Sequence, residues 1–228
     1  MFQLRDVSKV YQKRRQQVVA FRADQLEIGT GEYVAVVGPS GSGKTTLLSL
    51  LGGMLSPDSG QVLFDGQSIY DLSLTERTRL RRERIGFVFQ TFNLIPYLTA
   101  LENVQVPLFL GKVAASEQRD RSIALLEQVG LKDRLDHKPC ELSTGQQQRV
   151  ALARTLANNP RLILADEPTG NLDPESREAV LAMFDGFVRD GRTIVMVTHD
   201  PAAAERSARR ILLRDGVIEA EVQSRSAA

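Results

Sequence analysis

The sequence is poor in cysteine and nearly neutral. Cys140 is the only cysteine among 228 residues, so the chain cannot form an internal disulfide and fits a reducing compartment. We expect this cysteine to be a small, half-buried residue. The 29 basic and 28 acidic residues nearly cancel. Because such a chain has no global field to attract nucleic acid, we expect no nucleic-acid partner.

Long apolar runs are also missing. No stretch reaches the roughly 18 consecutive apolar residues of a membrane-spanning helix. Residues 1–15 are charged and alternate in hydropathy, without the apolar run of a signal peptide. We therefore expect any role at a membrane to depend on a partner. Hydrophobic residues make up 42% of the chain, which suits one large α/β domain over residues 1–228.

Hydrophobic patterning predicts the strands of this domain. Residues 2–9 and 18–28 alternate between apolar and polar, which indicates an antiparallel β-subdomain at the N-terminus. Short, fully apolar runs are typical of central strands in a parallel sheet, and they occupy residues 33–37, 85–89, 162–165 and 193–198. A last strand pair is expected around Asp215 and Gly216, followed by a polar tail. The predicted fold class is α/β with a parallel-sheet core.

The middle of the chain, from about residue 91 to 158, has a mostly helical pattern interrupted by proline and glycine. We expect it to form a helical subdomain inserted in the α/β core. Within it, Ser143 followed three residues later by Gln146 is the pattern of a capping box. The helix that this box would start keeps Val150, Ala153 and Ala157 on one face.

A glycine-rich loop follows the strand at 33–37. Residues 38–45 match G-x-x-x-x-G-K-[ST] and lead into a helix, which is the context that a phosphate-binding loop requires. Backbone N–H groups and the helix N-terminus would hold phosphates, Lys44 would reach the β- and γ-phosphates, and the Thr45 hydroxyl would ligate Mg²⁺. The predicted nucleotide-binding residues here are Gly38, Pro39, Ser40, Gly41, Ser42, Gly43, Lys44, Thr45 and Thr46.

Two acids end the apolar strand at 162–165. Asp166 and Glu167 need an electrostatic reason to follow a buried strand, because unpaired buried carboxylates are costly. At the strand tip Asp166 can serve the Mg²⁺ ion, and Glu167 can polarise a water for attack on the γ-phosphate. The alternative is an acid pair that caps the next loop.

Further motifs make the sequence resemble a known family. Residues 142–150 (LSTGQQQRV) resemble the LSGGQ signature of ABC ATPases, and residues 166–173 (DEPTGNLD) resemble their Walker B segment and D-loop. Tyr11, Gln90 and His199 resemble the adenine-stacking aromatic, the Q-loop glutamine and the switch histidine, all in family order. Other phosphate-loop proteins, such as RecA-like enzymes and GTPases, lack the signature between the Q-loop and Walker B.

This resemblance implies an enzyme that hydrolyses ATP with Mg²⁺. Gln90 would contact the metal and the water, and His199 would hold the attacking water together with Glu167. Lys44 would complete the catalytic set. In the alternative interpretations Gln90 is a polar strand end, His199 caps a loop and Tyr11 is an ordinary core or surface tyrosine.

The resemblance also implies a head-to-tail homodimer with ATP sandwiched between the subunits. Ser143 and Gly145 of the signature would close on the γ-phosphate of the opposite subunit, and Asp173 of the D-loop belongs to the same nucleotide-binding set. The family usually has glycine where this chain has Thr144. A β-branched residue adds bulk there, so we expect a working site with altered affinity for the partner's nucleotide.

The apolar stretch 92–98, from Phe92 to Leu98, directly follows Gln90. In the family this region receives a membrane permease, so we expect the dock there; the alternative is that the stretch is core of the helical subdomain. The amino-acid sequences of this stretch and of residues 166–173 are most similar to those of the lipoprotein-release and macrolide-export branch. That resemblance places the protein at the cytoplasmic face of the cell membrane, bound through its permease.

Of two other functions, one remains open and one is disfavoured. A regulatory ATPase of the cell-division type, which gates a membrane partner without moving a substrate, would have a near-identical sequence. A soluble ABC ATPase that acts on DNA or ribosomes usually carries two fused ATPase domains or a long coiled-coil insertion, and this sequence has neither. Neither the transported substrate nor the permease can be read from this chain.

Overall fold

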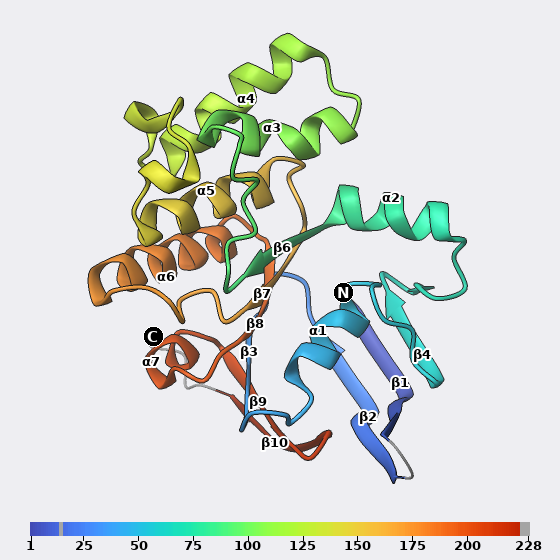
Figure 1. Ribbon diagram of the computed structural model, residues 1–228. Coiled ribbons are helices and arrows are strands. Elements are labelled where there is room, and N and C mark those ends of the chain that lie inside the picture. The colour runs from blue at the N-terminus through green and yellow to red at the C-terminus, as the bar shows by residue number, and fades with distance from the viewer. Residues whose placement is uncertain (14–15, 224–228) are drawn as a thin grey trace.

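The strands of the computed structural model, which describes residues 1–13 and 16–223, form one mixed sheet (Figure 1). Its ten described strands run in the order β5-β4-β1-β2-β10-β9-β3-β8-β7-β6. From β9 to β6 in this order, each strand pairs in parallel with the next one. The strands of this parallel part are β3 (Tyr33–Val37), β6 (Ile85–Phe89), β7 (Leu162–Asp166), β8 (Thr193–Val197) and β9 (Arg209–Arg214). The predicted α/β class with a parallel core is confirmed.

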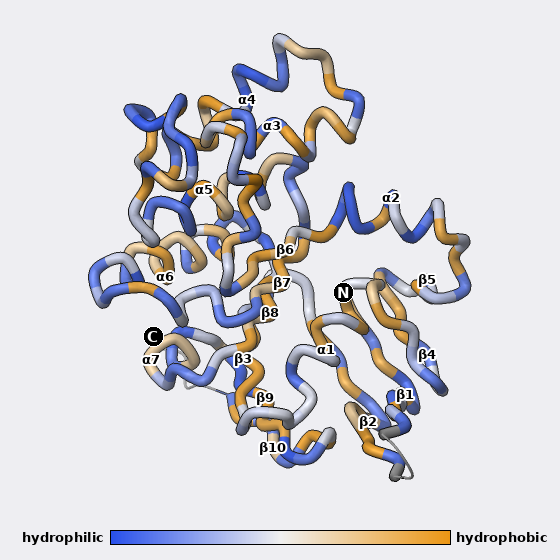
Figure 2. The backbone as a smooth tube through the Cα atoms, in the orientation of Figure 1, coloured by the Kyte–Doolittle hydropathy of each residue, from blue (hydrophilic) through white to orange (hydrophobic). Residues whose placement is uncertain are grey.

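Alternation along the central strands sends side chains to two different cores. On β7, Leu162 and Leu164 join the cluster that contains helix α1 (Lys44–Leu51), whereas Ile163 and Ala165 join the cluster that contains helix α6 (Pro174–Arg189). Successive strand residues point to opposite faces, so α1 covers one face of the sheet and α6 the other. Figure 2 shows β3, β7 and β8 as a hydrophobic band between these layers.

The N-terminal strands are antiparallel, as the alternation predicted. β1 (Phe2–Lys13) pairs with β2 (Gln16–Ile28) and with β4 (Ser59–Phe64), and β4 turns into β5 (Gln67–Ser68). Asp65 and Gly66 form this turn with positive φ angles of 49° and 82°, as a tight hairpin requires. β10 (Val217–Gln223) pairs with β9 and meets β2 at Val217, which joins the two halves into one sheet. The polar tail and the pair Arg14–Arg15 lie outside the described residues.

Helices fill the stretch between β6 and β7. α3 (Ala100–Leu110), α4 (Ala115–Gln128) and α5 (Thr144–Leu156) pack around a third cluster, with the 3₁₀ turns η1 (Lys132–Arg134) and η2 (Pro139–Glu141) between them. The capping box of Ser143 and Gln146 starts α5 as predicted. Val150, Ala153 and Ala157 face the third cluster, while Leu152 and Leu156 face the sheet.

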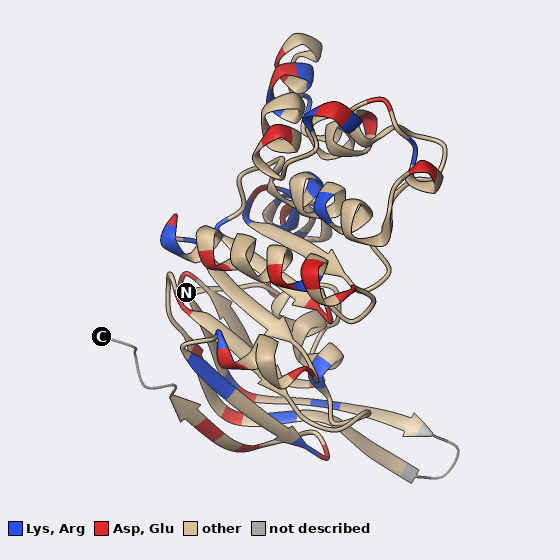
Figure 3. Cartoon of the chain, turned by 90° about the vertical axis from the view of Figure 1, so that its left-hand side faces the viewer, with Lys and Arg blue, Asp and Glu red and all other residues tan. Residues whose placement is uncertain are grey.

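The remaining helices are α2 (Leu74–Arg84), which precedes β6, and α7 (Pro201–Glu205), which follows β8. Figure 3 shows acidic and basic residues interspersed along the helices, consistent with the near-neutral charge. No helix within the described residues is long and apolar enough to cross a bilayer. Cys140 is exposed, which corrects the expected half-burial: in η2 it is Pro139 that turns inward.

Candidate functional site

The phosphate loop, residues 38–45, is held tightly against neighbouring strands. A Cβ added to Gly38 would lie 2.1 Å from the Leu213 carbonyl oxygen on β9, and one added to Gly43 would lie 2.3 Å from the Ala20 carbonyl oxygen on β2. Gly43 also has a φ of 101°, which disfavours any side chain. The glycines are therefore required by the path of the loop between β3 and α1.

The loop leaves donors unsatisfied around its centre. α1 begins after Gly43 with no side-chain cap and no acidic residue in its first turn, so its first N–H groups are open. Among the described atoms, the buried Oγ of Ser42 has no hydrogen-bond partner. The Nζ of Lys44 donates to the carbonyl oxygens of Gly38 and Pro39, at 2.8 Å each. Open N–H groups, a buried hydroxyl and an ammonium in one loop fit phosphate oxygens.

Thr45 and Asp166 meet beside this loop. The Thr45 hydroxyl donates to Oδ2 of Asp166 at 3.3 Å, across the gap between α1 and the end of β7. Burial raises the pKa of Asp166, and the neighbouring Glu167 raises it further, while the Thr45 hydrogen bond and Lys44 partly oppose the shift. A cation would relieve this unfavourable buried charge.

The composition of this pair fits magnesium in particular. No three His, Cys, Asp or Glu side chains gather into a metal cage among the described residues. Mg²⁺ does not need such a cage, because it is usually held by one or two carboxylates together with phosphate oxygens and waters. One hydroxyl and one carboxylate next to a phosphate-binding loop therefore suit Mg²⁺ bound with a nucleotide.

Glu167 and His199 form the next pair along the sheet edge. Nδ1 of His199 lies 2.8 Å from Oε1 of Glu167, and the His199 main-chain N–H donates to Oε2 at 3.3 Å. The side chain of Glu167 is only 15% exposed, whereas that of His199 is 70% exposed. Glu167 has a φ of 48°, an uncommon conformation for a side-chain-bearing residue that often marks functional positions.

A cavity of about 260 Å³ opens on this pair. Its walls come from the loops after β7 and β8 and from the start of α6. They include Thr169, Gly170, Arg177 and Asp200 in addition to the pair itself. The carboxylate of Glu167 and the imidazole of His199 thus face a space large enough for a water molecule and part of a ligand.

Gln90 lies against the same loop. Phe89 pairs with Asp166 in the parallel ladder, so Gln90 is the first residue beyond that pair. A Cβ on Gly170 would lie 3.1 Å from Nε2 of Gln90, and Asn171 donates to the Gln90 carbonyl oxygen at 3.1 Å. The structure therefore brings Lys44, Thr45, Asp166, Glu167, His199 and Gln90 to adjoining loops at one edge of the parallel strands.

The signature residues lie elsewhere. Ser143 caps α5, and a Cβ on Gly145 would lie 2.2 Å from Oγ of Ser176 on α6. Asp173 caps α6 by accepting a hydrogen bond from the Ser176 N–H at 2.9 Å. Figure 1 shows α5 and α6 side by side, on the face of the sheet opposite α1. The predicted set therefore divides into a phosphate-loop group and a signature group within one chain.

Thr144 is compatible with the helix that it begins. It is exposed, and it is not among the residues with positive φ, so no glycine-specific conformation is required there. The β-branched side chain adds bulk at the protein surface and does not strain the backbone. Any effect of Thr144 must therefore act on what approaches the start of α5.

Tyr11 stands at the end of the β1–β2 hairpin. It pairs with Val18, and the two side chains are each 47% exposed. The Lys9 ammonium lies 5.7 Å from the centre of the Tyr11 ring. Ala20, which contacts Gly43, is two residues along β2 from Val18, so this exposed ring stands a short distance beyond the phosphate loop. Its open face suits stacking by a planar base.

Sequence reasoning missed three polar contacts around the site. Gln148 is fully buried in α5 and donates to the Pro168 carbonyl oxygen at 2.5 Å, next to Glu167. Arg154 donates to the carbonyl oxygens of Phe92 and Asn93. Asn171 contacts Gln90, as described above. For Gln148 the available signal was a polar residue on an otherwise apolar helix face, which indicates a buried partner but does not identify it.

Comparison with known proteins places this geometry in a large family. The sequence model described as ABC transporter matches residues 21–170. The chain is 47% identical to the ABC transporter ATP-binding protein YvrO of Bacillus subtilis, over 95% of this chain and 94% of that protein. It is 48% identical to the macrolide export ATP-binding/permease protein MacB of Syntrophobacter fumaroxidans, over 97% of this chain but only 31% of that protein.

A solved structure is similar over the whole chain. The ATP-binding cassette MJ0796 of Methanocaldococcus jannaschii, described as a dimer in a post-hydrolysis state bound to ADP and Pi, superposes with a TM-score of 0.91. The two sequences are 44% identical, and the match covers 99% of this chain and 100% of the other.

Proposed function

This chain belongs to the ABC transporter family and is an ATPase of that family, and we propose that it drives export through a separate membrane permease. The proposal includes ATP bound with Mg²⁺, a head-to-tail homodimer and a position at the cytoplasmic face of the cell membrane. The family-level activity is independent of these finer points, each of which has its own support.

The nucleotide site is assigned from the residues at the sheet edge. We propose that the phosphate loop and Lys44 hold the phosphates, that Tyr11 stacks on adenine, and that Thr45, Asp166 and Gln90 face the Mg²⁺. The metal would neutralise phosphate charge. Glu167 would orient a water and take up its proton, with His199 fixing the carboxylate through the 2.8 Å contact. This Glu167–His199 pair, beside Asp166, is the observation on which the proposed ATP hydrolysis rests.

The dimer is supported by the division of the site within one chain. Ser143 and Gly145 lie with α6, away from α1, so a second chain must supply them to the first chain's phosphate loop. The open N-terminus of α5 and the Ser143 hydroxyl would then face the γ-phosphate of the partner. The MJ0796 cassette, which is described as dimeric, supports a dimer for this chain.

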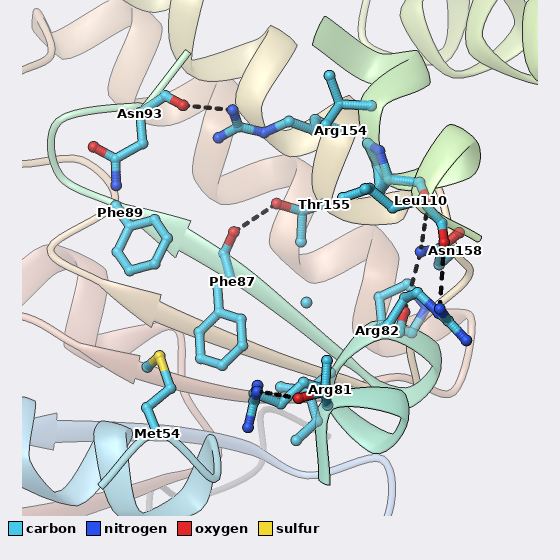
Figure 4. A pocket seen from close by; sticks show the side chains of 16 residues that line it. Met54, Arg81, Arg82, Phe87, Phe89, Asn93, Leu110, Arg154, Thr155 and Asn158 are labelled. Atoms are coloured by element: carbon cyan, nitrogen blue, oxygen red, sulfur yellow. Dashed lines mark hydrogen bonds between the residues drawn. The ribbon is translucent and has the colours of Figure 1, made fainter. Parts of the chain in front are cut away.

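The permease dock is supported by a groove next to the predicted stretch. A cavity of about 540 Å³ lies between α2, β6 and α3, with Phe87, Phe89, Pro107 and Leu110 among its lining residues (Figure 4). Arg81, Arg82 and Arg154 also contribute, and no acidic residue does among the described residues that line it. The groove therefore suits an apolar segment that carries acidic side chains.

The stretch 92–98 itself is only partly available. Phe92 and Leu94 pack against the second and third clusters, and Leu98 is half-buried. Ile95 and Tyr97 are 39% and 83% exposed. Because they follow Asn93, which lines the groove, we propose that they form its rim and that the dock comprises the groove and these two side chains.

Reconstitution with a permease tests the proposal. The chain is co-expressed with candidate permeases from its own genome, and the purified complex is placed in phospholipid liposomes. We expect ATP turnover to rise with the right permease and to require Glu167, together with movement of a substrate across or out of the bilayer. Turnover that rises without any substrate movement would instead support the regulatory, cell-division type of function.

A further inference from the structure

Arg154 connects the groove to the segment that carries Gln90. It lies in the last turn of α5, where its two terminal nitrogens donate to consecutive main-chain oxygens, 2.7 Å to Phe92 and 2.5 Å to Asn93. Figure 4 shows its side chain extended from α5 toward Asn93, and both residues line the groove. A planar guanidinium is suited to such a forked contact.

The two residues that Arg154 holds have an unusual backbone. Phe92 and Asn93 have φ angles of 57° and 49°, so two successive side-chain-bearing residues are left-handed. Such conformations are uncommon and persist where the surroundings impose them. The loop's own bonds are short-range, from Phe92 N–H to the Phe89 oxygen and from Asn93 N–H to the Thr91 oxygen. Arg154 supplies a long-range contact to these two residues, from 61 residues away in sequence.

The guanidinium lines the groove, and within the described residues it donates to these two main-chain oxygens. Burial lowers the pKa of Arg154, although an arginine stays charged in proteins. None of the ion pairs formed by the described residues includes it. A buried charge without a carboxylate is costly unless it is well hydrogen-bonded. Its contacts with the two carbonyls account for its place.

Gln90 is two residues from this clamp and touches the catalytic loop. Its Nε2 approaches Gly170, whose N–H donates to the Glu167 carbonyl oxygen at 3.1 Å. We propose that Arg154 is a positioning residue that fixes the segment 90–93, so that Gln90 is held for hydrolysis and responds to what occupies the groove. The proposal rests on the role proposed above for Gln90, but not on the identity of the permease.

The test is a double-mutant cycle in the full chain without a permease. Arg154→Met is made alone and together with Gln90→Ala, and kcat, KM for ATP and the melting temperature are measured. We expect Arg154→Met to lower kcat about tenfold with KM within about twofold, and to add less than about twofold in the Gln90→Ala background. A residue that acts through another should show this non-additivity, whereas a merely structural one should not.

Two further variants keep the result decisive. Arg192→Met removes another half-buried arginine, which bonds Asn159 and Asp190 far from the segment, and should leave kcat unchanged. Arg154→Lys keeps the charge but not the fork, so it should recover only part of kcat and replaces Arg154→Met if that variant does not fold. The proposal would be overturned if Arg154→Met lowered kcat by the same factor in the wild-type and Gln90→Ala backgrounds. It would also be overturned if Arg154→Met raised KM alone. An inactive wild-type chain would instead contradict the ATPase assignment itself.

Discussion

His199 and Glu167 are joined through two contacts, from the imidazole to one carboxylate oxygen and from the His199 main-chain N–H to the other. The pair bridges the loops that follow two neighbouring parallel strands, β7 and β8. Because a main-chain donor is involved, replacing the imidazole removes only one of the two contacts.

Glu167→Gln should separate nucleotide binding from hydrolysis. The amide is nearly isosteric and still accepts the His199 N–H, but it cannot take a proton from water. Loss of a general base typically costs about 10²–10⁴-fold in rate. We expect turnover to fall by that factor while ATP–Mg²⁺ still raises the melting temperature. A variant that is destabilised yet active would show that Glu167 serves only the structure.

Lys44→Ala should abolish hydrolysis and weaken nucleotide binding. Charge-assisted hydrogen bonds contribute roughly 1.5–3 kcal/mol each, so we expect about tenfold or greater loss of ATP affinity by calorimetry. Lys132→Ala is the matched control, since its ion pair with Glu127 is exposed and should matter little. Normal ATPase activity in Lys44→Ala would contradict the assignment of the phosphate loop.

Asp166→Asn should stabilise the nucleotide-free protein while removing its activity. The pKa of Asp166 is raised in the folded state, so the folded state favours the proton and ionisation costs stability as pH rises through the unfolded pKa. At pH 7 the variant should therefore melt higher, by ~2–4 °C for each kcal/mol gained.

The same argument sets the control conditions. The difference in melting temperature should vanish below pH ~4, the ordinary pKa range of an aspartate. There the wild-type carboxyl is protonated, and therefore as uncharged as the asparagine, in both the folded and the unfolded state. With ATP and Mg²⁺ the order should reverse, because only the carboxylate serves the metal. An equal gain from ATP–Mg²⁺ in both proteins would remove Asp166 from the metal site.

Much of the fold was readable because local signals agreed. Runs such as 162–165 are apolar on both faces of the sheet, and the structure divides Leu162 and Ile163 between two cores. The Ser143–Gln146 box fixed the start of α5 from side-chain chemistry alone. The joining of the two parts of the sheet through the pair Val217 and Arg22 could not be predicted, because one residue pair leaves no pattern in the sequence.

The sequence yields a set of candidate site residues, whose roles stay predictions, but not the contacts between them. The motifs place Asp166 and Gln90 at strand ends, and parallel pairing then makes them neighbours. Hydropathy could not show which side chains of 92–98 face inward, so the stretch looked like one exposed patch, whereas Phe92 and Leu94 pack inside. Arg154 was missed because its partners are main-chain oxygens, which carry no residue-specific signal.

Dimerisation should require ATP and a blocked hydrolysis step. The Glu167→Gln protein should be mostly monomeric without nucleotide and should double in mass with ATP–Mg²⁺ by light scattering. Adding Ser143→Arg, which places a bulky cation at the exposed start of α5, should prevent the increase without changing ATP affinity of the monomer. An increase that survives this change would point to a dimer that does not use the signature.

The last prediction concerns the rim of the groove. Tyr97 is 83% exposed, so replacing it removes little packing within the chain, whereas Ile95 is 39% exposed. We expect Tyr97→Ala and Ile95→Asp to leave basal ATPase within about threefold, and Tyr97→Ala to leave the melting temperature nearly unchanged. Tyrosine is among the residue types whose truncation in an interface commonly costs about 2 kcal/mol or more. The same variants should therefore lose permease-stimulated turnover and co-purification.

Leu74→Ala provides the matched control, because Leu74 is 75% exposed on α2 and does not line the groove. This variant should bind and respond to the permease as the wild type does. If Tyr97→Ala instead unfolds the isolated chain, the stretch 92–98 is core, as the alternative reading of the sequence holds. If all three variants keep full stimulation, the permease docks elsewhere, and the arginine-lined groove has a different occupant.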